Sequence, residues 1–498
     1  MRLNVSEAVR HWAKKDKGTV AISGEYVRTY EQLNRNVNGL AEQIVQCFGS
    51  RKRIGILSKK KYQFIVALIS LIRTNNVFVL INPNLSGDQI EKCLDAGECD
   101  GIITCENYDV NSRFPCINLP VDGDALLLSS KELFPDQYSG TEDIGGVLFT
   151  SGTTGIPKGL IRTNYSLLSE AILWMVELSL SQKVSFFIPR PLYNTTGFVL
   201  LYATLFAGGR TDIFDSISAE GILEYFAKTK CEWALLVPST IREILYNYSD
   251  SHGQTFDKVL TIGESISAEA KLEFAKRFSC SVYESWGNSE GLGTITEASM
   301  LYSAPKSAGR PFFTDRVEII KIESDETADV NEVGRICGYS DNEFSEYINN
   351  SELTEKVISS AGRIFSSDLG YMDADGQLYV MSRSDDVIIT DGINVYPSDI
   401  EKVATLISEI SDCVVLGIKN KVSEVPIAII QLSKATNAKE ACIMEKINIK
   451  LAQHEKIHHV LFVEKVPRNE NGKVNKNAIK ERHASNIRDL PGGPYVFK

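Results

Sequence analysis

Residues 148–164 of the chain, LFTSGTTGIPKGLIRTN, combine hydroxyl side chains, glycines and one lysine in a short run. Hydroxyls can donate hydrogen bonds to an anion, glycines let backbone N–H groups approach it closely, and lysine adds positive charge. Backbone N–H groups at such turns commonly hold phosphate. We therefore predict a loop that binds a polyphosphate. Its residues are Ser151, Gly152, Thr153, Thr154, Gly155 and Lys158.

The order of residues in this loop argues against kinase and NTPase chemistry. The P-loop of those proteins reads G-x-x-x-x-G-K-[ST], with a glycine before the lysine and a hydroxyl residue after it. Here Pro157 precedes Lys158 and Gly159 follows it. A Ser/Gly/Thr-rich turn without a ligand is the alternative, and the density of hydroxyls, glycines and the lysine disfavours it.

Further motifs follow in the order found in one known family. FTSGTTGIPKG closely resembles the signature loop of the adenylate-forming enzymes, which include acyl- and aryl-CoA synthetases, adenylation domains and luciferases. SWGNSEG (285–291) resembles the motif Y-G-x-T-E of that family, and residues 366–386 resemble its T-G-D…G-R-x-D-D region. PRNENGKVNK (467–476) resembles its C-terminal P-R-x-x-x-G-K loop. The resemblance covers nearly the whole chain, and it is closest to acyl- and aryl-CoA ligases.

The resemblance implies how ATP and Mg²⁺ would be bound. The loop residues and Lys158 would hold the β and γ phosphates, and Trp286 would stack on adenine in place of the usual Tyr. Glu290 would hold Mg²⁺ between phosphate oxygens, as suits a hard carboxylate. Gly287 and Ser289 complete this motif, with the Ser289 hydroxyl near the α-phosphate in place of the usual Thr.

Three residues in the last third of the chain match the other nucleotide contacts of the family. Asp368 would accept hydrogen bonds from both ribose hydroxyls, and Arg383 would make the second contact with ribose or phosphate. Lys473 would neutralise the charge that develops between a carboxylate and the α-phosphate. A lone Asp, Glu or Lys is more often a solvated surface residue, and the joint occurrence of the motifs in family order outweighs that alternative here.

The implied reaction needs no general base. A substrate carboxylate attacks the α-phosphorus of ATP, pyrophosphate leaves and an acyl-adenylate remains. Carboxyl groups with a pKa near ~4 are already ionised at neutral pH, and no histidine lies between residues 12 and 251. The acyl group would then pass to the phosphopantetheine thiol of CoA or of an acyl or peptidyl carrier protein. In the family the small domain turns about the residue that matches Asp385, which would bring the segment around Gly392 to the thiol channel.

The residues around the expected acid pocket narrow the substrate. PLYNTTG (191–197) resembles the ligase segment P-[LM]-[FY]-H-x-x-G, with Asn194 in place of His. Residues 197–209 offer no carboxylate to pair with an α-ammonium group, and Gly287 leaves room for an acid larger than acetate. We expect a medium-chain or aryl acid rather than an α-amino acid. The predicted pocket residues are Tyr193, Asn194, Gly263, Gly287 and Leu292.

Three functions therefore stay open. The leading one is a carboxylate–CoA ligase, and a close alternative is a stand-alone adenylation enzyme that loads a carrier protein. The third is a pseudoenzyme that binds a nucleotide or acyl-adenylate without catalysis, which the presence of Lys158, Glu290, Asp368 and Lys473 disfavours.

Composition sets the outer limits of these hypotheses. A chain of 498 residues has length for about two to four folding units. Its net charge of −11 argues against a nucleic-acid or anionic-membrane partner. No apolar run reaches the roughly 18 residues of a membrane span, and the start of the chain lacks a signal-peptide core, so a cytoplasmic protein is expected. The ten cysteines form no C-x-x-C pair, which disfavours a zinc site.

The elements that must position these residues alternate between strand and helix. Apolar runs such as 53–58, 76–82 and 100–104 predict buried strands, with helices between them, and the alternation resumes after a helix that starts with Asn164 as its N-cap. Short alternating strands between about 305 and 380 predict a small antiparallel, β-barrel-like sheet. We expect an α/β fold with two doubly wound subdomains and this sheet in a large N-terminal domain (1–383). A smaller, mobile α+β domain (384–498) would follow.

Overall fold

The computed structural model describes most of the chain. The described residues are 2–106, 113–135, 137–150, 158–247, 256–264, 266–390, 392–419, 424–433, 438–468, 473–491 and 493–498. The predicted phosphate-loop residues Ser151, Gly152, Thr153, Thr154 and Gly155 lie outside these ranges, so their proposed contacts stay a prediction.

A seven-stranded sheet forms around the first strand–helix repeats. Its strand order is β18-β8-β7-β4-β3-β5-β6, and the strands from β7 to β6 run parallel. Because parallel strands are covered on both faces, they consist of continuous apolar runs, as in β3, whose last four residues are all buried. The bounds are β3 (Arg53–Leu57), β4 (Val77–Leu80), β5 (Gly101–Thr104), β6 (Cys116–Asn118), β7 (Ile144–Thr150), β8 (Lys158–Thr163) and β18 (Glu346–Tyr347).

A second, nine-stranded sheet follows the order β15-β14-β13-β12-β11-β9-β10-β1-β2. The six strands from β13 to β1 run parallel, so the loops that follow them leave the sheet at the same edge. The bounds are β1 (Val20–Gly24), β2 (Arg28–Thr29), β9 (Ser185–Phe187), β10 (Arg210–Ile213), β11 (Trp233–Leu235), β12 (Lys258–Ile262), β13 (Ser281–Gly287), β14 (Gly293–Ile295) and β15 (Arg310–Pro311).

Helices cover both sheets, and one of them is buried almost throughout. α6 (Thr195–Ala207) is apolar on all sides because α1 (Val5–Lys15) and α5 (Asn164–Glu177) also pack against it. The N-cap of α5 is Thr163 rather than the predicted Asn164, because the Thr163 hydroxyl accepts a hydrogen bond from the Ser166 N–H (3.1 Å). The other helices of this region are α2 (Tyr30–Cys47), α3 (Lys61–Arg73), α4 (Gly87–Ala96), α7 (Ala219–Lys228), α8 (Pro238–Asn247), α9 (Ala268–Phe278) and α10 (Met300–Ser303).

The predicted small antiparallel sheet is present, with the order β16-β17-β19-β20. Its strands are β16 (Asp315–Ile320), β17 (Gly334–Ser340), β19 (Ile364–Met372) and β20 (Leu378–Arg383). α11 (Ser351–Val357) precedes β19. A 3-10 turn, Ser384–Asp386, follows β20 directly and leads to the C-terminal elements.

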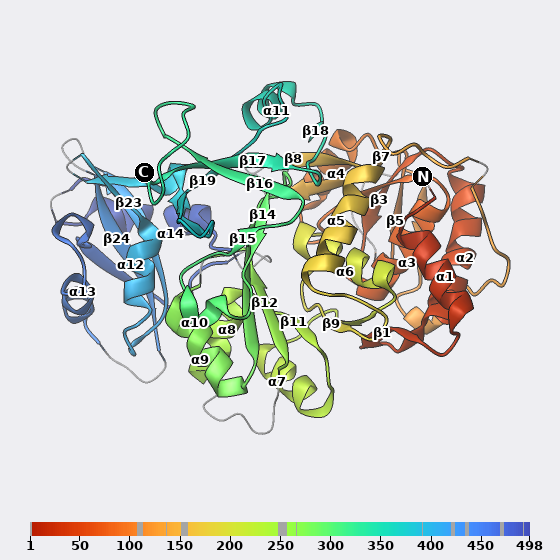
Figure 1. The fold of residues 1–498 in the computed structure, drawn as a ribbon, viewed down its shortest axis with the longest axis horizontal. Helices are drawn as coiled ribbons and strands as arrows, with labels where there is room; N and C mark the ends of the chain where they lie inside the picture. The colour runs from red at the N-terminus through yellow and green to blue at the C-terminus, as the bar shows by residue number, and fades with distance from the viewer. Residues whose placement is uncertain are drawn as a thin grey trace.

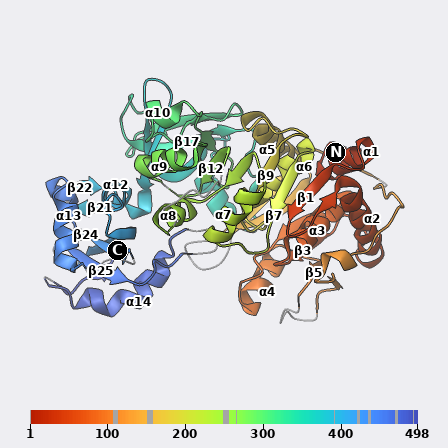
Figure 2. The ribbon, with the colours of Figure 1, turned by 90° about the horizontal axis from the view of Figure 1, so that it is seen from below.

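The C-terminal elements build a smaller α+β unit with hydrophobic clusters of its own. Its sheet has the order β25-β24-β23-β26, and β21 pairs with β22 in a separate hairpin. Figure 1 shows this unit at one end of the molecule and α1, α2 and α3 at the other, and Figure 2 shows the same separation from below. The bounds are β21 (Ile388–Thr390), β22 (Ile393–Val395), α12 (Pro397–Ala404), β23 (Ile410–Lys419), β24 (Glu424–Leu432), α13 (Glu440–Asn448), β25 (His459–Val463), α14 (Lys476–Arg488) and β26 (Val496–Phe497).

This architecture confirms the predicted α/β fold with a large N-terminal and a smaller C-terminal domain. In the part of the chain that the structure describes, no helix has the length and apolar character needed to cross a membrane.

Candidate active site

Lys158 and Glu290 meet at a tyrosine that no motif had indicated. Lys158 is the first residue of β8, and its ammonium lies 5.9 Å from the centre of the Tyr347 ring, within cation–π range. The Tyr347 hydroxyl donates a hydrogen bond to a carboxylate oxygen of Glu290. β18 places Tyr347 there because it pairs with β8, with Tyr347 opposite Leu160. The structure therefore links two predicted site residues through a third.

Tyr347 is held as a hydrogen-bond donor. Its side chain is buried, and burial together with the negative charge of Glu290 raises its pKa well above the usual value for tyrosine. The phenol consequently keeps its proton at neutral pH and orients the Glu290 carboxylate. The short segment around Tyr347 carries no pattern that would have indicated this role from the sequence.

The turn that carries Ser289 and Glu290 is fixed from both sides. The Asn288 side chain accepts hydrogen bonds from the N–H groups of Gly291 (3.0 Å) and Leu292 (2.9 Å). Gly291 has φ +130°, and a Cβ there would lie only 2.7 Å from the backbone of Glu343, so a side chain would not fit. The Phe344 N–H also donates to the Glu290 carbonyl at 3.0 Å. Glu290 thus has a well-defined position.

Glu290 suits the magnesium role that the motif implies. Among the described residues, no group of three or more His, Cys, Asp or Glu side chains could hold a metal by itself. Mg²⁺ typically takes one or two protein carboxylates and completes its shell with water and substrate phosphate oxygens. A single, oriented carboxylate close to Lys158 therefore fits a metal that arrives with a polyphosphate.

Asp368, Arg383 and Trp286 converge where β13 meets the small sheet. Asp368 on β19 lies opposite Arg383 on β20, and 3.8 Å separates the Arg383 Nε from the carboxylate. The Trp286 indole N–H donates to the other oxygen of Asp368 at 2.9 Å. Burial raises the pKa of Asp368, and the Trp286 hydrogen bond and the charges of Arg383 and Lys473 oppose that shift. The indole is partly buried against the small sheet, so its predicted stacking on adenine would use a ring already fixed in place.

Lys473 comes from the small domain and lies among these groups. It stands in the loop between β25 and α14, one residue before Val474. Lys473 is exposed as a whole residue. Partial loss of hydration around its ammonium lowers its pKa, and the positive charge of Arg383 lowers it further. Asp368 and Glu264 oppose this shift. The structure thus brings Lys473 close to Asp368 and Arg383, from which it is far apart in sequence.

Arg190 is a buried cation that the motif comparison missed. It is 9% exposed, and burial lowers its pKa to about 10. Its charge acts on Lys473, and the charge of Glu264 acts on it. The signal in the sequence was an arginine within the apolar run FFIPRPLY, where a charged residue needs a partner or a ligand.

The predicted acid-pocket residues follow the carboxyl ends of parallel strands of the nine-stranded sheet. Tyr193 and Asn194 come after β9, Gly263 after β12, and Gly287 ends β13. In open α/β sheets, ligands bind at this edge. Leu292, which is buried, follows the turn after β13. All five residues therefore lie at or near this edge of the sheet, and their contacts with an acid remain a prediction.

Two details of this edge leave room for a ligand. A Cβ on Gly263, whose φ is +103°, would have no atom within 4 Å. The Asn194 side-chain nitrogen is buried without a hydrogen-bond partner among the described residues, and Asn194, the N-cap residue of α6, makes no capping hydrogen bond with its side chain. The Tyr193 hydroxyl accepts a hydrogen bond from Asn84 at 3.4 Å.

The predicted hinge and thiol-channel residues lie in turns. Asp385 is exposed in the 3-10 turn between β20 and β21. Gly392 has φ +80° in the turn of the β21–β22 hairpin, and a Cβ there would meet no atom within 4 Å. The roles of Asp385 as hinge and of Gly392 at the thiol channel stay predictions.

Comparison with known proteins gives two family matches that together span most of the chain. Residues 9–348 match the family described as AMP-binding enzyme, and residues 399–473 match the AMP-binding enzyme C-terminal domain. The 2-succinylbenzoate–CoA ligase of Geobacillus sp. (strain WCH70) is 25% identical over 472 residues, which cover 92% of this chain and 93% of that protein. The protein of the same name from Bacillus cereus (strain ATCC 10987 / NRS 248) is 25% identical over 478 residues, or 95% and 97% of the two chains.

Solved structures share the fold. ATP-bound MatB from Rhodopseudomonas palustris has a TM-score of 0.85 at 21% identity, over 96% of this chain and 99% of that one. The o-succinylbenzoate CoA synthetase of Bacillus subtilis, solved with its acyl-adenylate intermediate, has a TM-score of 0.84 at 21% identity, over 95% and 97%. The arrangement of both domains is therefore one that known proteins adopt.

Proposed function

The chain belongs to the AMP-binding enzyme family, as its motifs predict, and on that basis we propose that it is an AMP-forming carboxylic acid–CoA ligase. One observation supports this most directly. Lys473, from the small domain, lies within electrostatic range of Asp368 and Arg383 of the large domain, so the charges of these two residues act on it. A cation from one domain near the proposed nucleotide residues of the other would suit the activation of an acid by ATP.

In the proposed first step, a carboxylate oxygen of the acid attacks the α-phosphorus of ATP and pyrophosphate leaves. The chain contributes position and charge rather than a base. Lys158 and the loop before it would hold the leaving pyrophosphate, Asp368 would hold the ribose, and Lys473 would neutralise charge at the reacting oxygens. Mg²⁺, held by Glu290, would supply further positive charge at the phosphate oxygens.

In the proposed second step, the thiol of CoA attacks the acyl carbon of the adenylate, and AMP leaves with the shared oxygen. We propose that domain 384–498 turns about Asp385 between the steps, which would remove Lys473 and bring Gly392 to the thiol channel. The exposed 3-10 turn after β20 and the unobstructed space at Gly392 support this division. The use of ATP and CoA suits a cytoplasmic enzyme.

We propose an aryl acid, with a medium-chain acid as the alternative, as the substrate. Relatives named 2-succinylbenzoate–CoA ligase act on an aryl acid, and at 25% identity they support this class without identifying the compound. The open space at Gly263 and the unpartnered Asn194 amide suit an acid that is larger than acetate and carries a polar group.

The test is carboxylate-dependent exchange of labelled pyrophosphate into ATP. The panel should hold substituted benzoates, 2-succinylbenzoate, medium-chain fatty acids, malonate and acetate, each with and without Mg²⁺. Exchange with aryl acids and not with acetate is expected. Thioester formation is then measured with CoA and with a holo-carrier protein, and CoA is the expected acceptor. Binding of an acyl-adenylate analogue without exchange from any acid would instead support the pseudoenzyme.

A further inference from the structure

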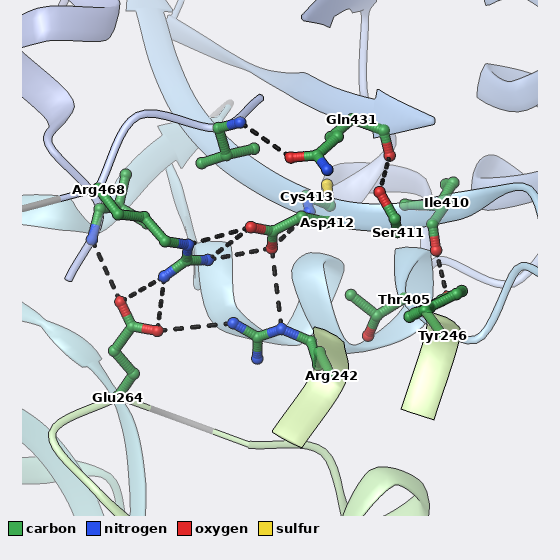
Figure 3. A network of polar contacts seen from close by, with 12 residues as sticks. Arg242, Tyr246, Glu264, Thr405, Ile410, Ser411, Asp412, Cys413, Gln431 and Arg468 are labelled. Atoms are coloured by element: carbon green, nitrogen blue, oxygen red, sulfur yellow. Dashed lines mark hydrogen bonds and ion pairs between the residues drawn. The ribbon is translucent and has the colours of Figure 1, made fainter. Parts of the chain in front are cut away.

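Four charged side chains form a cluster between the two domains, shown in Figure 3. Arg242 on α8 and Glu264 after β12 belong to the large domain, and Asp412 on β23 and Arg468 after β25 belong to the small one. Arg468 donates to both carboxylate oxygens of Glu264, at 2.6 and 2.7 Å, and to Asp412 at 2.8 to 3.1 Å. Arg242 lies 3.5 Å from Glu264 and 3.9 Å from Asp412.

The cluster is well suited to hold the domains in one orientation. All four side chains are between 13% and 17% exposed, so solvent screens their charges only in part. Burial alone would lower the pKa of Arg468, but the negative charges of Asp412 and Glu264 have the larger effect, so its pKa is raised. Bidentate contacts between a guanidinium and a carboxylate fix the relative orientation of the two groups as well as their distance. The Tyr246 hydroxyl donates to the Ile410 carbonyl at the same interface.

Glu264 also contacts the segment that carries Lys473 through the backbone of Val474. One of its oxygens also accepts a hydrogen bond from the Val474 N–H at 3.2 Å. Arg468 and Val474 are paired across the loop in a β-bridge, so Glu264 contacts both sides of its base. Lys473 is the neighbour of Val474. A single carboxylate of the large domain therefore contacts both Arg468 and Val474, which lie on the two sides of the segment that carries Lys473.

We propose that Glu264 is a positioning residue for adenylate formation, which acts by holding the Arg468–Val474 loop base so that Lys473 faces the nucleotide site. The inference rests on the proposed function, but it concerns a residue to which that function assigns no role. Because the contacts join the two domains, they exist only while the domains keep this orientation. Glu264 would therefore favour the first half-reaction over the second.

The main test compares Glu264→Ala with the wild type in the two half-reactions. The rate of pyrophosphate exchange should fall about tenfold to a hundredfold, as expected for the loss of charged hydrogen bonds. Thioester formation from supplied acyl-adenylate should stay within about twofold or become faster. Glu264→Gln keeps an acceptor for the Val474 N–H and should lose less in exchange than Glu264→Ala. Asp412→Asn leaves the Glu264 contacts in place, so its rate of pyrophosphate exchange should also fall less than that of Glu264→Ala.

A second readout does not depend on activity. Hydrogen exchange of the Val474 amide should become faster in Glu264→Ala, because that variant removes its acceptor. The matched control is Glu232→Gln, which breaks the 2.8 Å pair with Lys258 inside the large domain and should alter neither readout. Equal losses in both half-reactions, or an unchanged Val474 amide, would overturn the proposal. If the wild type shows no exchange with any acid, the proposed function fails, and the Val474 measurement still tests the contact.

Discussion

The Tyr347 hydroxyl donates a hydrogen bond to Glu290 while the Tyr347 ring lies beneath the Lys158 ammonium. One buried side chain thus sets the mutual position of a carboxylate and a cation that belong to motifs more than a hundred residues apart. In the proposed reaction these two groups bind the same leaving group, one through Mg²⁺ and one directly. Their spacing would therefore matter as much as their presence.

Replacement of Tyr347 by Phe should change the Mg²⁺ requirement of the enzyme more than its folding stability. Tyr347→Phe keeps the ring beneath Lys158 and removes the donor to Glu290. We expect the Mg²⁺ concentration for half-maximal pyrophosphate exchange to rise about threefold to tenfold, since a hydrogen bond to a charged group is lost. Tyr379→Phe removes a comparable phenol–carboxylate contact, with Asp373 at 3.1 Å, away from the site and serves as control. An identical Mg²⁺ requirement in Tyr347→Phe would contradict the orienting role.

Loss of the Lys473 cation should separate the half-reactions. Lys473→Ala should lower acyl-adenylate formation by about a hundredfold or more, because charge at the reacting oxygens is no longer neutralised. Thioester formation from supplied acyl-adenylate should remain largely intact. Both rates are measured in single-turnover assays. Lys476→Ala, which removes a neighbouring lysine paired with Asp386 at 2.5 Å, is the control for charge in this region. An equal reduction of both rates would refute the assigned role.

Replacement of Asn194 should stabilise the protein but weaken its binding of the acid. Its buried nitrogen has no partner among the described residues, and an unsatisfied buried polar group costs about 1–3 kcal/mol. Asn194→Ala should therefore leave the thermal midpoint of the free protein unchanged or raise it, while KM for the acid increases. Asn36 is the contrast, because its amide donates to the Leu126 and Leu127 carbonyls and accepts from Tyr62. Asn36→Ala should lower the midpoint, and a similar drop in Asn194→Ala would argue for a structural role.

Lys61 should make the stability of the large domain depend on pH. Burial lowers its pKa from the ordinary 10.5 to about 7, and its ammonium donates to the Ile188 carbonyl at 3.4 Å. Between these values the unfolded chain binds one more proton than the folded one, so stability rises with pH by about 1.4 kcal/mol per unit. Lys61→Met removes this rise and should be more stable than the wild type near pH 7, with a smaller difference near pH 9.

The control for that experiment is the adjacent lysine. Asp215 raises the pKa of Lys60 through an ion pair at 2.7 Å, so Lys60→Met should lower stability near neutral pH rather than raise it. Urea unfolding followed by tryptophan fluorescence at several pH values measures both variants. Parallel pH profiles for the wild type and Lys61→Met would show that Lys61 does not titrate in this range.

Local patterns in the chain were enough to predict the family and the fold class, and they nominate nucleotide residues whose roles stay a prediction. Loop spelling, motif order and the alternation of apolar strands and helices depend on residues that are close together in sequence. For the same reason Glu290, Asp368, Arg383 and Lys473 could be assigned roles one at a time. The N-cap of α5 shows the limit of such patterns, because Thr163 and Asn164 are both good caps and only the backbone geometry selects Thr163.

The tertiary structure alone decided which of these residues meet and what holds them. Tyr347 contacts Glu290 because β18 pairs with β8, and Arg468 bridges Glu264 and Asp412. Arg190 is buried within electrostatic range of Glu264 and Lys473. Each of these contacts joins segments far apart in the chain, and it depends on strand pairing, domain orientation and side-chain packing. A single sequence carries no periodic or motif signal for such pairs, because their partners are chosen only when the sheets and domains come together.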